Sequence, residues 1–332
     1  MPEAPTATEI AAGKKAAISR ALNMVEDRRP ASQTAIESLL SALAAVQREQ
    51  PPGHRVGLTG PPGVGKSTLT AALARELRAR NRRVGVVAVD PSSVRSGGAL
   101  LGDRARMSFD PADVGLFVRS LATSGDAGGL SYAAPGAVEV LATAYGTVLV
   151  ETTGVGQTET DVEHLVDTVC LVIQPGSGDV LQFIKAGIME IPDVLVVNKA
   201  DHGRLARRAA SDLTGALSTL RGTVAGKSAG NAGWQVPVCL TSARDREGIG
   251  ELVDVLDRHR ATLDGSPLAQ RRAAGVLAWA QSLFIRMHGE HGVAVMGGRA
   301  GLAQRLREQL SSGMSAPAAA RTLASAYLAR LK

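Results

Sequence analysis

Runs of apolar residues alternate with amphipathic stretches through the middle of the chain. Between the apolar runs, helical spacing of hydrophobic positions predicts helices at 66–80, 130–145 and 203–221. The runs themselves are apolar almost throughout, so both faces of each strand should be buried. The pattern predicts an α/β fold in which a mostly parallel sheet is flanked by helices. The predicted strands are 55–59, 84–89, 115–119, 147–151, 168–173, 194–198 and 236–241.

The two ends of the chain show helical patterns only. Residues 1–50 have helical spacing, and Pro51 to Gly53 end that segment. From about residue 266 the pattern is again purely helical. We therefore expect an N-terminal helical extension (1–50), a central domain (51–265) and a C-terminal helical arm (266–332). The arm either packs back on the domain or serves in interaction or dimerisation. Its predicted helices are 268–288, 299–311 and 316–331.

Composition narrows the class of protein. Only 3% of the 332 residues are aromatic against 45% hydrophobic, so the core must be built mostly from aliphatic side chains. The net charge is +6, which raises the question of nucleic-acid binding. The basic residues, however, are scattered over helices such as Arg75–Arg83 and Arg204–Arg208, without interleaved aromatic residues. Solvated helix faces explain them better, and no nucleic-acid partner is expected.

Cysteine usage and hydropathy bear on the compartment. Cys170 and Cys239 both lie in apolar strand runs, which favours buried thiols over a disulfide and suits a reducing cytoplasm. No apolar run reaches the length of a membrane span, and the N-terminus lacks an apolar signal core. We expect a soluble, cytoplasmic protein with no membrane partner.

A phosphate-binding loop follows the first predicted strand and opens the first helix of the central domain. The segment GPPGVGKS matches G-x-x-x-x-G-K-[ST]. Glycines allow backbone N–H groups to turn toward phosphate oxygens, and the helix N-terminus adds its dipole. Lys66 should bridge the β- and γ-phosphates, and Ser67 should ligate Mg²⁺. The predicted phosphate-binding residues are Gly60, Pro61, Pro62, Gly63, Val64, Gly65, Lys66, Ser67 and Thr68.

A second motif, Asn198-Lys199-Ala200-Asp201, closes the strand at 194–198. The Asp201 carboxylate can accept two hydrogen bonds from the N1–H and 2-amino group of guanine. Adenine offers neither, so a buried Asp201 would reject ATP. Asn198 suits the O6/N7 edge of guanine, and the Lys199 stem can pack over the base. Residues 241–243, which include Ser242 and Ala243, resemble the short loop that completes a guanine pocket.

Further polar residues follow other strands. Glu151 ends the strand at 147–151, where a carboxylate would lie near Mg²⁺, and Gly154 would then sense the γ-phosphate. Gln157 is either a residue near the attacking water or a solvated switch residue. Asp90 ends the second strand at the same edge of the sheet, unless it only caps a Pro-Ser turn. Histidines at 288 and 291 fit a helix-end loop better than a metal site.

Six segments of the chain resemble the MeaB/ArgK family, in the family's order, over roughly residues 30–290. Members of this family are G-protein chaperones of adenosylcobalamin-dependent acyl-CoA mutases, chiefly methylmalonyl-CoA mutase. They belong to the SIMIBI class of P-loop GTPases, together with signal-recognition-particle and hydrogenase-nickel GTPases. The segments are GPPGVGKST, VDPSS, GALLGDRARM, ETTGVGQTE, QPGSGDVLQFIKAGI and NKAD.

The resemblance implies roles that the residues alone do not give. It places Asp90, Asp103 and Glu151 around Mg²⁺, although the loop with Asp103 also reads as a plain surface loop. It makes Gln174 to Lys185 a switch segment that contacts the mutase, with Asp179 placed to cap the helix that follows. The alternative is that this segment is an ordinary connection between a strand and a helix. Thr153 stands where members commonly have Val.

The function implied is GTP hydrolysis used as a conformational switch, with Lys66, Asp90, Glu151 and Gln157 as candidate catalytic residues. The protein would gate the loading of adenosylcobalamin onto methylmalonyl-CoA mutase and protect or reactivate that enzyme. Cobalamin would belong to the partner, because the chain has no D-x-H-x-x-G signature. The arm would form a homodimer.

Three alternatives differ in client or in chemistry. The alternative client is another cobalamin-dependent acyl-CoA mutase, such as isobutyryl- or ethylmalonyl-CoA mutase. A nickel-insertion GTPase would need a Cys/His-rich segment, which the chain lacks. A small-molecule kinase would rarely need the guanine specificity of the NKAD motif.

Overall fold

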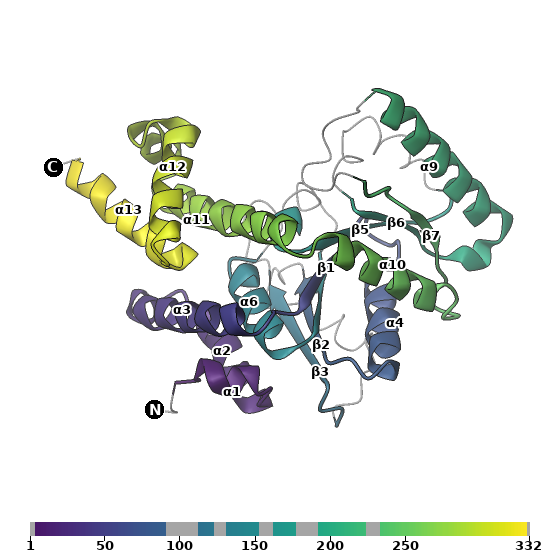
Figure 1. Ribbon diagram of the computed structural model, residues 1–332, viewed down its shortest axis with the longest axis horizontal. Helices are drawn as coiled ribbons and strands as arrows, with labels where there is room; N and C mark the ends of the chain where they lie inside the picture. Colours follow the sequence, from purple (N-terminus) through teal and green to yellow (C-terminus); the bar gives the residue numbers. More distant parts are fainter. Residues whose placement is uncertain are drawn as a thin grey trace, which may run out of the picture.

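A seven-stranded sheet forms the centre of the molecule in the computed structural model (Figure 1). The structure describes residues 4–90, 112–122, 131–152, 162–176, 192–223 and 233–330. The strand order is β3-β2-β4-β1-β5-β6-β7, and every pair of neighbours is parallel. The predicted α/β fold with a parallel sheet is therefore confirmed. The strands are β1 (His54–Thr59), β2 (Val84–Asp90), β3 (Leu116–Ala122), β4 (Thr147–Glu151), β5 (Thr168–Ile173), β6 (Val194–Val197) and β7 (Val238–Leu240).

The edge strands differ most from the prediction. β3 runs to Ala122, three residues beyond the predicted end, because it pairs with β2 along its whole length. β7 has three residues instead of six, and Leu240 at its end is 37% exposed. A short edge strand leaves few unpaired backbone groups, which limits unwanted pairing with other chains.

Helices cover both faces of the sheet. On one face, α4 (Lys66–Ala79) and α10 (Ile249–Thr262) pack on side chains that include Cys170, Val172 and Val196. On the other face, α6 (Ala134–Ala144) covers the middle of the sheet, and α9 (Arg204–Thr223) lies over β6 and β7. Alternate residues of each strand therefore enter opposite layers, and this explains why the strand sequences are apolar throughout.

The N-terminal helices belong to the same core as the sheet. They are α1 (Ala7–Ala11), α2 (Lys15–Val25), the 3₁₀ turn η1 (Pro30–Ser32) and α3 (Gln33–Glu49). Ile18, Leu22 and Leu43 are fully buried in one hydrophobic cluster with Val87 and Val148 of the sheet. The extension is thus a second layer of helices over α6 rather than a unit with a core of its own.

The C-terminal helices form a separate hydrophobic cluster (Figure 1). They are α11 (Ser266–Val295), α12 (Gly298–Ser311) and α13 (Ala316–Arg330). The long helix α11 is interrupted at Gly289, whose φ of +61° lies in the left-handed region. An ion pair between Arg321 of α13 and Glu37 of α3 connects the arm to the N-terminal helices. Within the part of the chain that the structure describes, no helix is long and apolar enough to cross a membrane.

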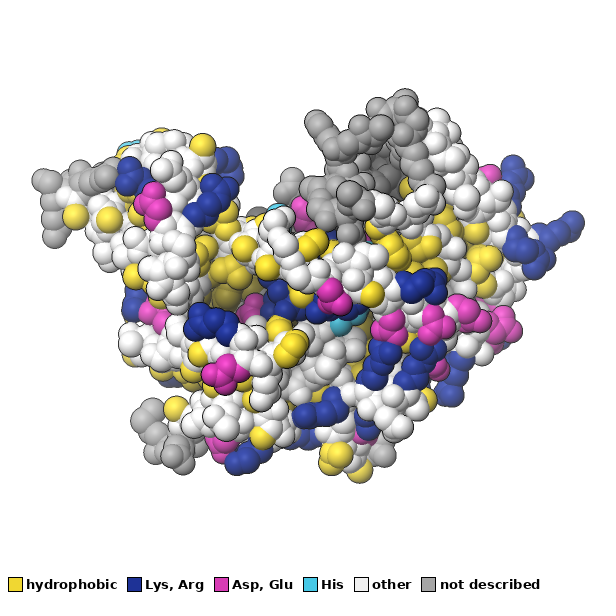
Figure 2. Space-filling view, viewed as in Figure 1, with side chains coloured by type: hydrophobic (Ala, Val, Ile, Leu, Met, Phe, Trp, Pro, Cys, Tyr) yellow, Lys and Arg dark blue, Asp and Glu magenta, His cyan; other side chains and the backbone are white. Residues whose placement is uncertain are grey.

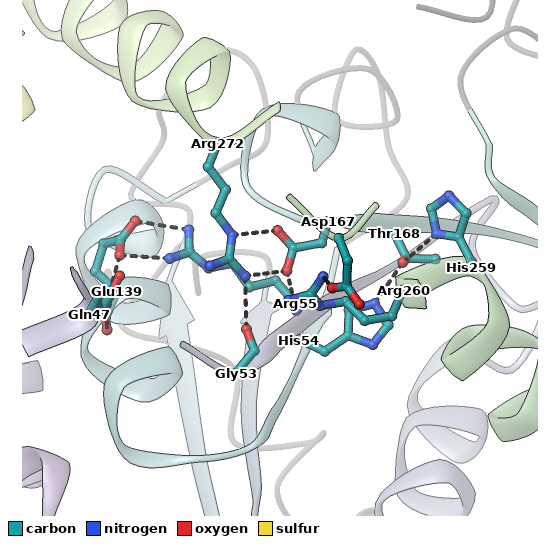
Figure 3. A network of polar contacts seen from close by, with 11 residues as sticks. Gln47, Gly53, His54, Arg55, Glu139, Asp167, Thr168, His259, Arg260 and Arg272 are labelled. Carbon is teal, nitrogen blue, oxygen red and sulfur yellow. Dashed lines mark hydrogen bonds and ion pairs between the residues drawn. The ribbon is translucent and has the colours of Figure 1, made fainter. Parts of the chain in front are cut away.

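Two consecutive arginines near the start of α11 attach the arm to the sheet. Arg272 forms two hydrogen bonds of 2.6 and 2.8 Å to Asp167, which directly precedes β5 (Figure 3). Arg271 contacts Asp193, which directly precedes β6, at 2.7 and 3.1 Å. Burial alone would raise the pKa of Asp167, but the hydrogen bonds and charge of Arg272 lower it, so the carboxylate stays ionised. These four residues are the arm anchor.

Two buried histidines flank a threonine at the amino-terminal edge of the sheet, where the arm anchor also lies. His54 Nε2 and His259 Nδ1 both lie 2.7 Å from Thr168 Oγ1. The hydroxyl carries one proton, so it donates to one imidazole and accepts from the other. Burial lowers the pKa of His54 to about 4. The folded protein therefore holds this side chain neutral.

This arrangement predicts a loss of stability in mild acid. The unfolded chain protonates His54 near pH 6.5, whereas the folded chain resists protonation until about pH 4. As the pH falls between these values, the free energy of unfolding should decrease by about 3 kcal/mol in total through His54. Urea titrations of the parent protein at several pH values in this range should show that the free energy of unfolding falls as the pH falls. His54→Gln should lack the part of this fall that is due to His54. An equal dependence on pH in both proteins would contradict the low pKa of His54.

Candidate functional site

The predicted site residues gather at one edge of the sheet. All strands are parallel, so their carboxyl ends meet at a single edge, where open α/β sheets bind ligands. The phosphate-binding loop follows β1, Glu151 ends β4, Asn198 follows β6, and Ser242 comes shortly after β7. The arm anchor and the histidine pair lie at the opposite, amino-terminal edge.

The loop between β1 and α4 needs glycine for reasons of space as well as conformation. Gly60 has a φ of +137°, and a Cβ atom there would lie 2.1 Å from the Val172 carbonyl oxygen of β5. Gly65 caps α4 with a φ of +92°, and a Cβ atom there would meet the Asn198 side chain at 2.6 Å. The backbone of β5 and the Asn198 side chain after β6 therefore leave no room for a side chain at these two positions. Their close packing fixes the shape of the loop before any ligand binds.

Lys66 begins α4 with its side chain folded back over the loop. It is 7% exposed, and its Nζ donates to the carbonyl oxygens of Gly60 at 2.7 Å and Pro61 at 2.9 Å. The ammonium group thus lies beside backbone N–H groups at a helix N-terminus. An anion at this position would meet both the fixed charge and the helix dipole. Thr68, also predicted to bind nucleotide, is exposed on the first turn of α4.

Ser67 and Glu151 face each other beside this loop. The Ser67 hydroxyl donates to Glu151 Oε1 at 2.5 Å, and Glu151 is 4% exposed. Glu151 occupies this place because it pairs with Leu58 of β1 and with Ala88 of β2. Asp90 lies two residues beyond Ala88, so its backbone is at the same edge. A hydroxyl and a carboxylate are hard oxygen ligands, and these two fit a magnesium ion.

Asn198, which follows β6, connects the phosphate loop to the 241–243 loop. It is 2% exposed, and its Nδ2 donates to the Val64 carbonyl oxygen of the loop at 2.9 Å. Its Oδ1 accepts from Thr241 Oγ1 and from the Ala243 backbone N–H, both at 3.2 Å. The amide of Asn198 thus holds the phosphate loop and the 241–243 loop together.

Lys199 connects the same loop to the segment after β5. Its backbone is left-handed, with a φ of +61°. Its Nζ donates to the Gly63 carbonyl oxygen at 2.8 Å and to Gln174 Oε1 at 2.6 Å. The guanine motif, the phosphate loop and the start of the predicted switch segment are thus joined through one side chain.

Asp201 lies at the surface beside the 241–243 loop. It is exposed, and its Oδ1 is 3.1 Å from the hydroxyl of the fully buried Ser242. The same hydroxyl lies 2.8 Å from Asp245 Oδ2 and accepts from the Asp245 backbone N–H. The sequence pattern placed Thr241 in the 241–243 loop but did not single out Asp245, although S-x-x-D after a strand is a recognisable turn pattern.

Several predicted site residues lie outside the described part of the chain. These are Asp103, Gly154, Gln157, Asp179 and Lys185. The two cysteines are free, with Cys170 buried and Cys239 half-buried. Burial raises the pKa of both thiols, to about 11 for Cys239, so both are protonated at neutral pH.

Comparisons with known proteins identify the family of this chain. The family model described as "Methylmalonyl Co-A mutase-associated GTPase MeaB" matches residues 18–290. The chain belongs to the MeaB family. A probable GTPase of Mycobacterium tuberculosis is 41% identical over 263 residues, covering 78% of this chain and 75% of that protein. The mouse mitochondrial protein named methylmalonic aciduria type A homolog is 34% identical and covers 97% of this chain and 79% of its own length.

Solved structures agree with the family assignment. The crystal structure titled LAO/AO transport system kinase has a TM-score of 0.61 and 26% sequence identity. It covers 96% of this chain and 95% of its own. This MeaB-family member is a P-loop GTPase. Lys66 and Ser67 lie at the start of α4, directly after the loop that follows β1.

Proposed function

We propose that this MeaB-family GTPase uses GTP hydrolysis as a conformational switch on methylmalonyl-CoA mutase. In its GTP state the protein docks on the mutase, gates the loading of adenosylcobalamin, and helps to protect or reactivate the enzyme. Cobalamin is held by the partner, not by this chain. The description of the matched family and the name of the mouse relative support this client.

The contact of Lys199 with both Gly63 and Gln174 is the observation that carries the proposal. A switch needs a path from the nucleotide to the surface that meets the partner. Lys199 belongs to the guanine motif and contacts the phosphate loop at Gly63, and Gln174 opens the segment that ends at Lys185. A nucleotide that moves the loop or Lys199 therefore moves the start of this segment as well.

Hydrolysis rests on the groups around the phosphate loop. Lys66 binds the β- and γ-phosphates, while Ser67 and Glu151 hold Mg²⁺, together with Asp90 and Asp103. The metal ion, when bound, neutralises charge on the phosphate oxygens. Gly154 contacts the γ-phosphate and Gln157 orients water. Intrinsic turnover is slow in this proposal, since hydrolysis awaits the partner.

Guanine recognition rests on Asp201, which is exposed beside the 241–243 loop and whose carboxylate accepts from the base in this proposal. Asn198 holds the pocket walls, and Ser242 and Ala243 form the loop beside the base. The C-terminal arm is proposed to form a homodimer, and the protein is proposed to act in the cytoplasm.

The proposal predicts that Lys185→Ala uncouples the GTPase from the mutase. Nucleotide affinity and basal turnover should stay within about twofold of the parent, because coupling rather than chemistry is lost. Stimulation of turnover by added mutase should disappear. Arg207→Ala is the matched control, since it removes a positive charge from the exposed side of α9. Full stimulation of Lys185→Ala would eliminate the switch role of that residue.

A pull-down separates the possible clients. The protein loaded with a non-hydrolysable GTP analogue or with GDP is offered methylmalonyl-, isobutyryl- or ethylmalonyl-CoA mutase. Nucleotide-dependent retention of methylmalonyl-CoA mutase is the expected result. Retention of another mutase alone would reassign the client, and retention of none would reject the chaperone role.

A further inference from the structure

Two kinds of polar contact join neighbouring elements of the central domain. Basic and acidic side chains lie side by side near α4 and α10 on the face drawn in Figure 2, and Arg80 and Asp254 form one such pair at 2.6 Å. Because water surrounds these exposed ion pairs, they do little to fix the geometry of a site. The second kind is a buried contact between two threonine hydroxyls. Thr59 ends β1, Thr152 directly follows β4, and both residues are only 1% exposed.

This threonine pair lies beside the phosphate loop. Thr152 Oγ1 donates to Thr59 Oγ1 at 3.1 Å, and the Thr152 backbone N–H donates to the Leu58 carbonyl oxygen, also at 3.1 Å. Thr59 directly precedes the phosphate loop, and Thr152 directly follows Glu151. The pair therefore joins the start of the phosphate loop to the neighbour of the carboxylate that contacts Ser67.

The end of β4 is held from both faces of the sheet. Successive side chains of a strand point to opposite faces, and Leu149 packs in the layer of α4 whereas Val150 packs in the layer of α6. Glu151 continues the first series and meets Ser67 of α4. Thr152 continues the second series, toward α6. A carboxylate–hydroxyl contact thus holds the strand end on one face, and the threonine pair holds it on the other.

A magnesium ion makes strict demands on the position of its ligands. It requires a nearly octahedral arrangement of oxygen atoms at about 2.0–2.1 Å. Residues that orient a metal ligand therefore affect metal affinity although they do not touch the ion. Glu151 is the last residue of β4, and the ends of elements open more readily than their centres. A contact that closes the end of this strand keeps the carboxylate in place.

We propose that Thr59 and Thr152 are positioning residues for magnesium-dependent GTP hydrolysis. Their hydroxyls hold the end of β4 against β1, and this keeps the Glu151 carboxylate where it can bind the ion together with Ser67. This role rests on the proposed binding of Mg²⁺ by Glu151 and Ser67. It adds two residues that the proposed function does not use, on the face of the sheet opposite the Glu151–Ser67 contact.

The dependence of nucleotide binding on Mg²⁺ gives a readout besides turnover. The affinity of the full chain for a fluorescent, non-hydrolysable GTP analogue is measured over a range of Mg²⁺ concentrations. Thr152→Val keeps the branched shape but removes the hydroxyl, and it should raise the half-saturating Mg²⁺ concentration by about tenfold. Affinity for the analogue without Mg²⁺ should stay within about twofold of the parent, because the phosphate loop and the guanine motif are intact. Thr152→Ser restores the hydroxyl and should recover the parental Mg²⁺ dependence.

A double variant separates positioning from stability. Thr59→Val or Thr152→Val alone leaves one buried hydroxyl without its partner and should lower the melting temperature by about 2–4 °C. The double variant replaces both hydroxyls with methyl groups and should regain most of this stability. Its half-saturating Mg²⁺ concentration should stay about tenfold above that of the parent, because the contact is still missing. Thr147→Val, at the other end of β4, makes the same change at a buried threonine and should bind Mg²⁺ like the parent.

Three results would overturn the positioning role. The first is a parental Mg²⁺ dependence in the single and double variants. The second is a double variant in which stability and Mg²⁺ dependence both return to parental values, since the pair would then serve the fold alone. The third is an equal effect of Thr147→Val.

Glu151→Gln distinguishes these failures from a failure of the proposed metal site. This variant should itself raise the half-saturating Mg²⁺ concentration, because it removes the charge of a metal ligand. If Glu151→Gln responds and the threonine variants do not, only the positioning role is lost. If Glu151→Gln binds Mg²⁺ like the parent, the metal role of Glu151 is rejected, and the positioning role with it.

Discussion

Replacing Lys66 with alanine is expected to abolish GTP hydrolysis while the protein remains folded. The ammonium group is held beside the N-terminus of α4 by two carbonyl oxygens of its own loop. Negative charge builds up on the phosphate oxygens in the transition state, and this fixed cation stabilises it without reorganisation. A fall in turnover of at least 10²–10³-fold is expected, about the effect of removing one such stabilising group.

The fold should tolerate this change. Alanine has the highest helix propensity, so α4 can still begin at this position. The two contacts that are lost go to carbonyl groups of a loop that is shaped by the close approach of β5 at Gly60. Phosphate release and circular dichroism measure the two effects separately. Lys14→Ala, at a lysine whose side chain is 61% exposed, is the control and should hydrolyse GTP like the parent. Parental turnover in Lys66→Ala would refute the phosphate role.

Replacing Asp201 with asparagine is expected to weaken GTP binding and to shift preference toward xanthosine triphosphate. In the proposed complex the carboxylate accepts two hydrogen bonds from guanine, whereas the asparagine amide would place a donor opposite a donor. Hydrogen bonds to charged groups contribute about 1.5–3 kcal/mol each, so a loss of about 10²–10³-fold in GTP affinity is expected. Xanthine carries a carbonyl where guanine has its 2-amino group, so it can accept from the new amide.

The neighbouring Asp245 offers a matched control. Its carboxylate lies 2.8 Å from the Ser242 hydroxyl, within the loop after β7. Asp245→Asn makes the same chemical change a few ångströms from Asp201 and should preserve the preference for GTP. Equilibrium binding of GTP, xanthosine triphosphate and ATP to both variants decides between base recognition and a general disturbance of the loop. Unchanged GTP affinity in Asp201→Asn would remove the base-reading assignment.

The sequence was most informative where function depends on consecutive residues. The phosphate loop is recognisable because its glycines, Lys66 and Ser67 act through local backbone conformation at one strand–helix junction. The strands were predicted well in the centre of the sheet, where burial on both faces leaves continuous apolar runs. They were predicted less well at β3 and β7, because the length of an edge strand depends on its single neighbour.

The sequence was least informative where a residue's role depends on distant partners. Asn198 reads as a base-binding residue in its motif, yet its amide bonds to groups 134 and 45 residues away. Asp167 and Asp193 look like ordinary residues before strands. Their pairing with Arg272 and Arg271, 105 and 78 residues away, exists only because α11 returns to the amino-terminal edge of the sheet.

The sequence by itself thus determined the α/β layering, the phosphate loop and the guanine motif, since periodicity and local backbone geometry are properties of short segments. Tertiary structure alone decided that α2 and α3 complete the core over α6, and that Lys199 joins the loop to Gln174. It also decided that Arg55 of β1 pairs with Glu139 of α6, which lies 84 positions away in the chain. An apolar face or a charged side chain shows that a residue needs a partner, but only the packing of distant segments against one another selects which partner it obtains.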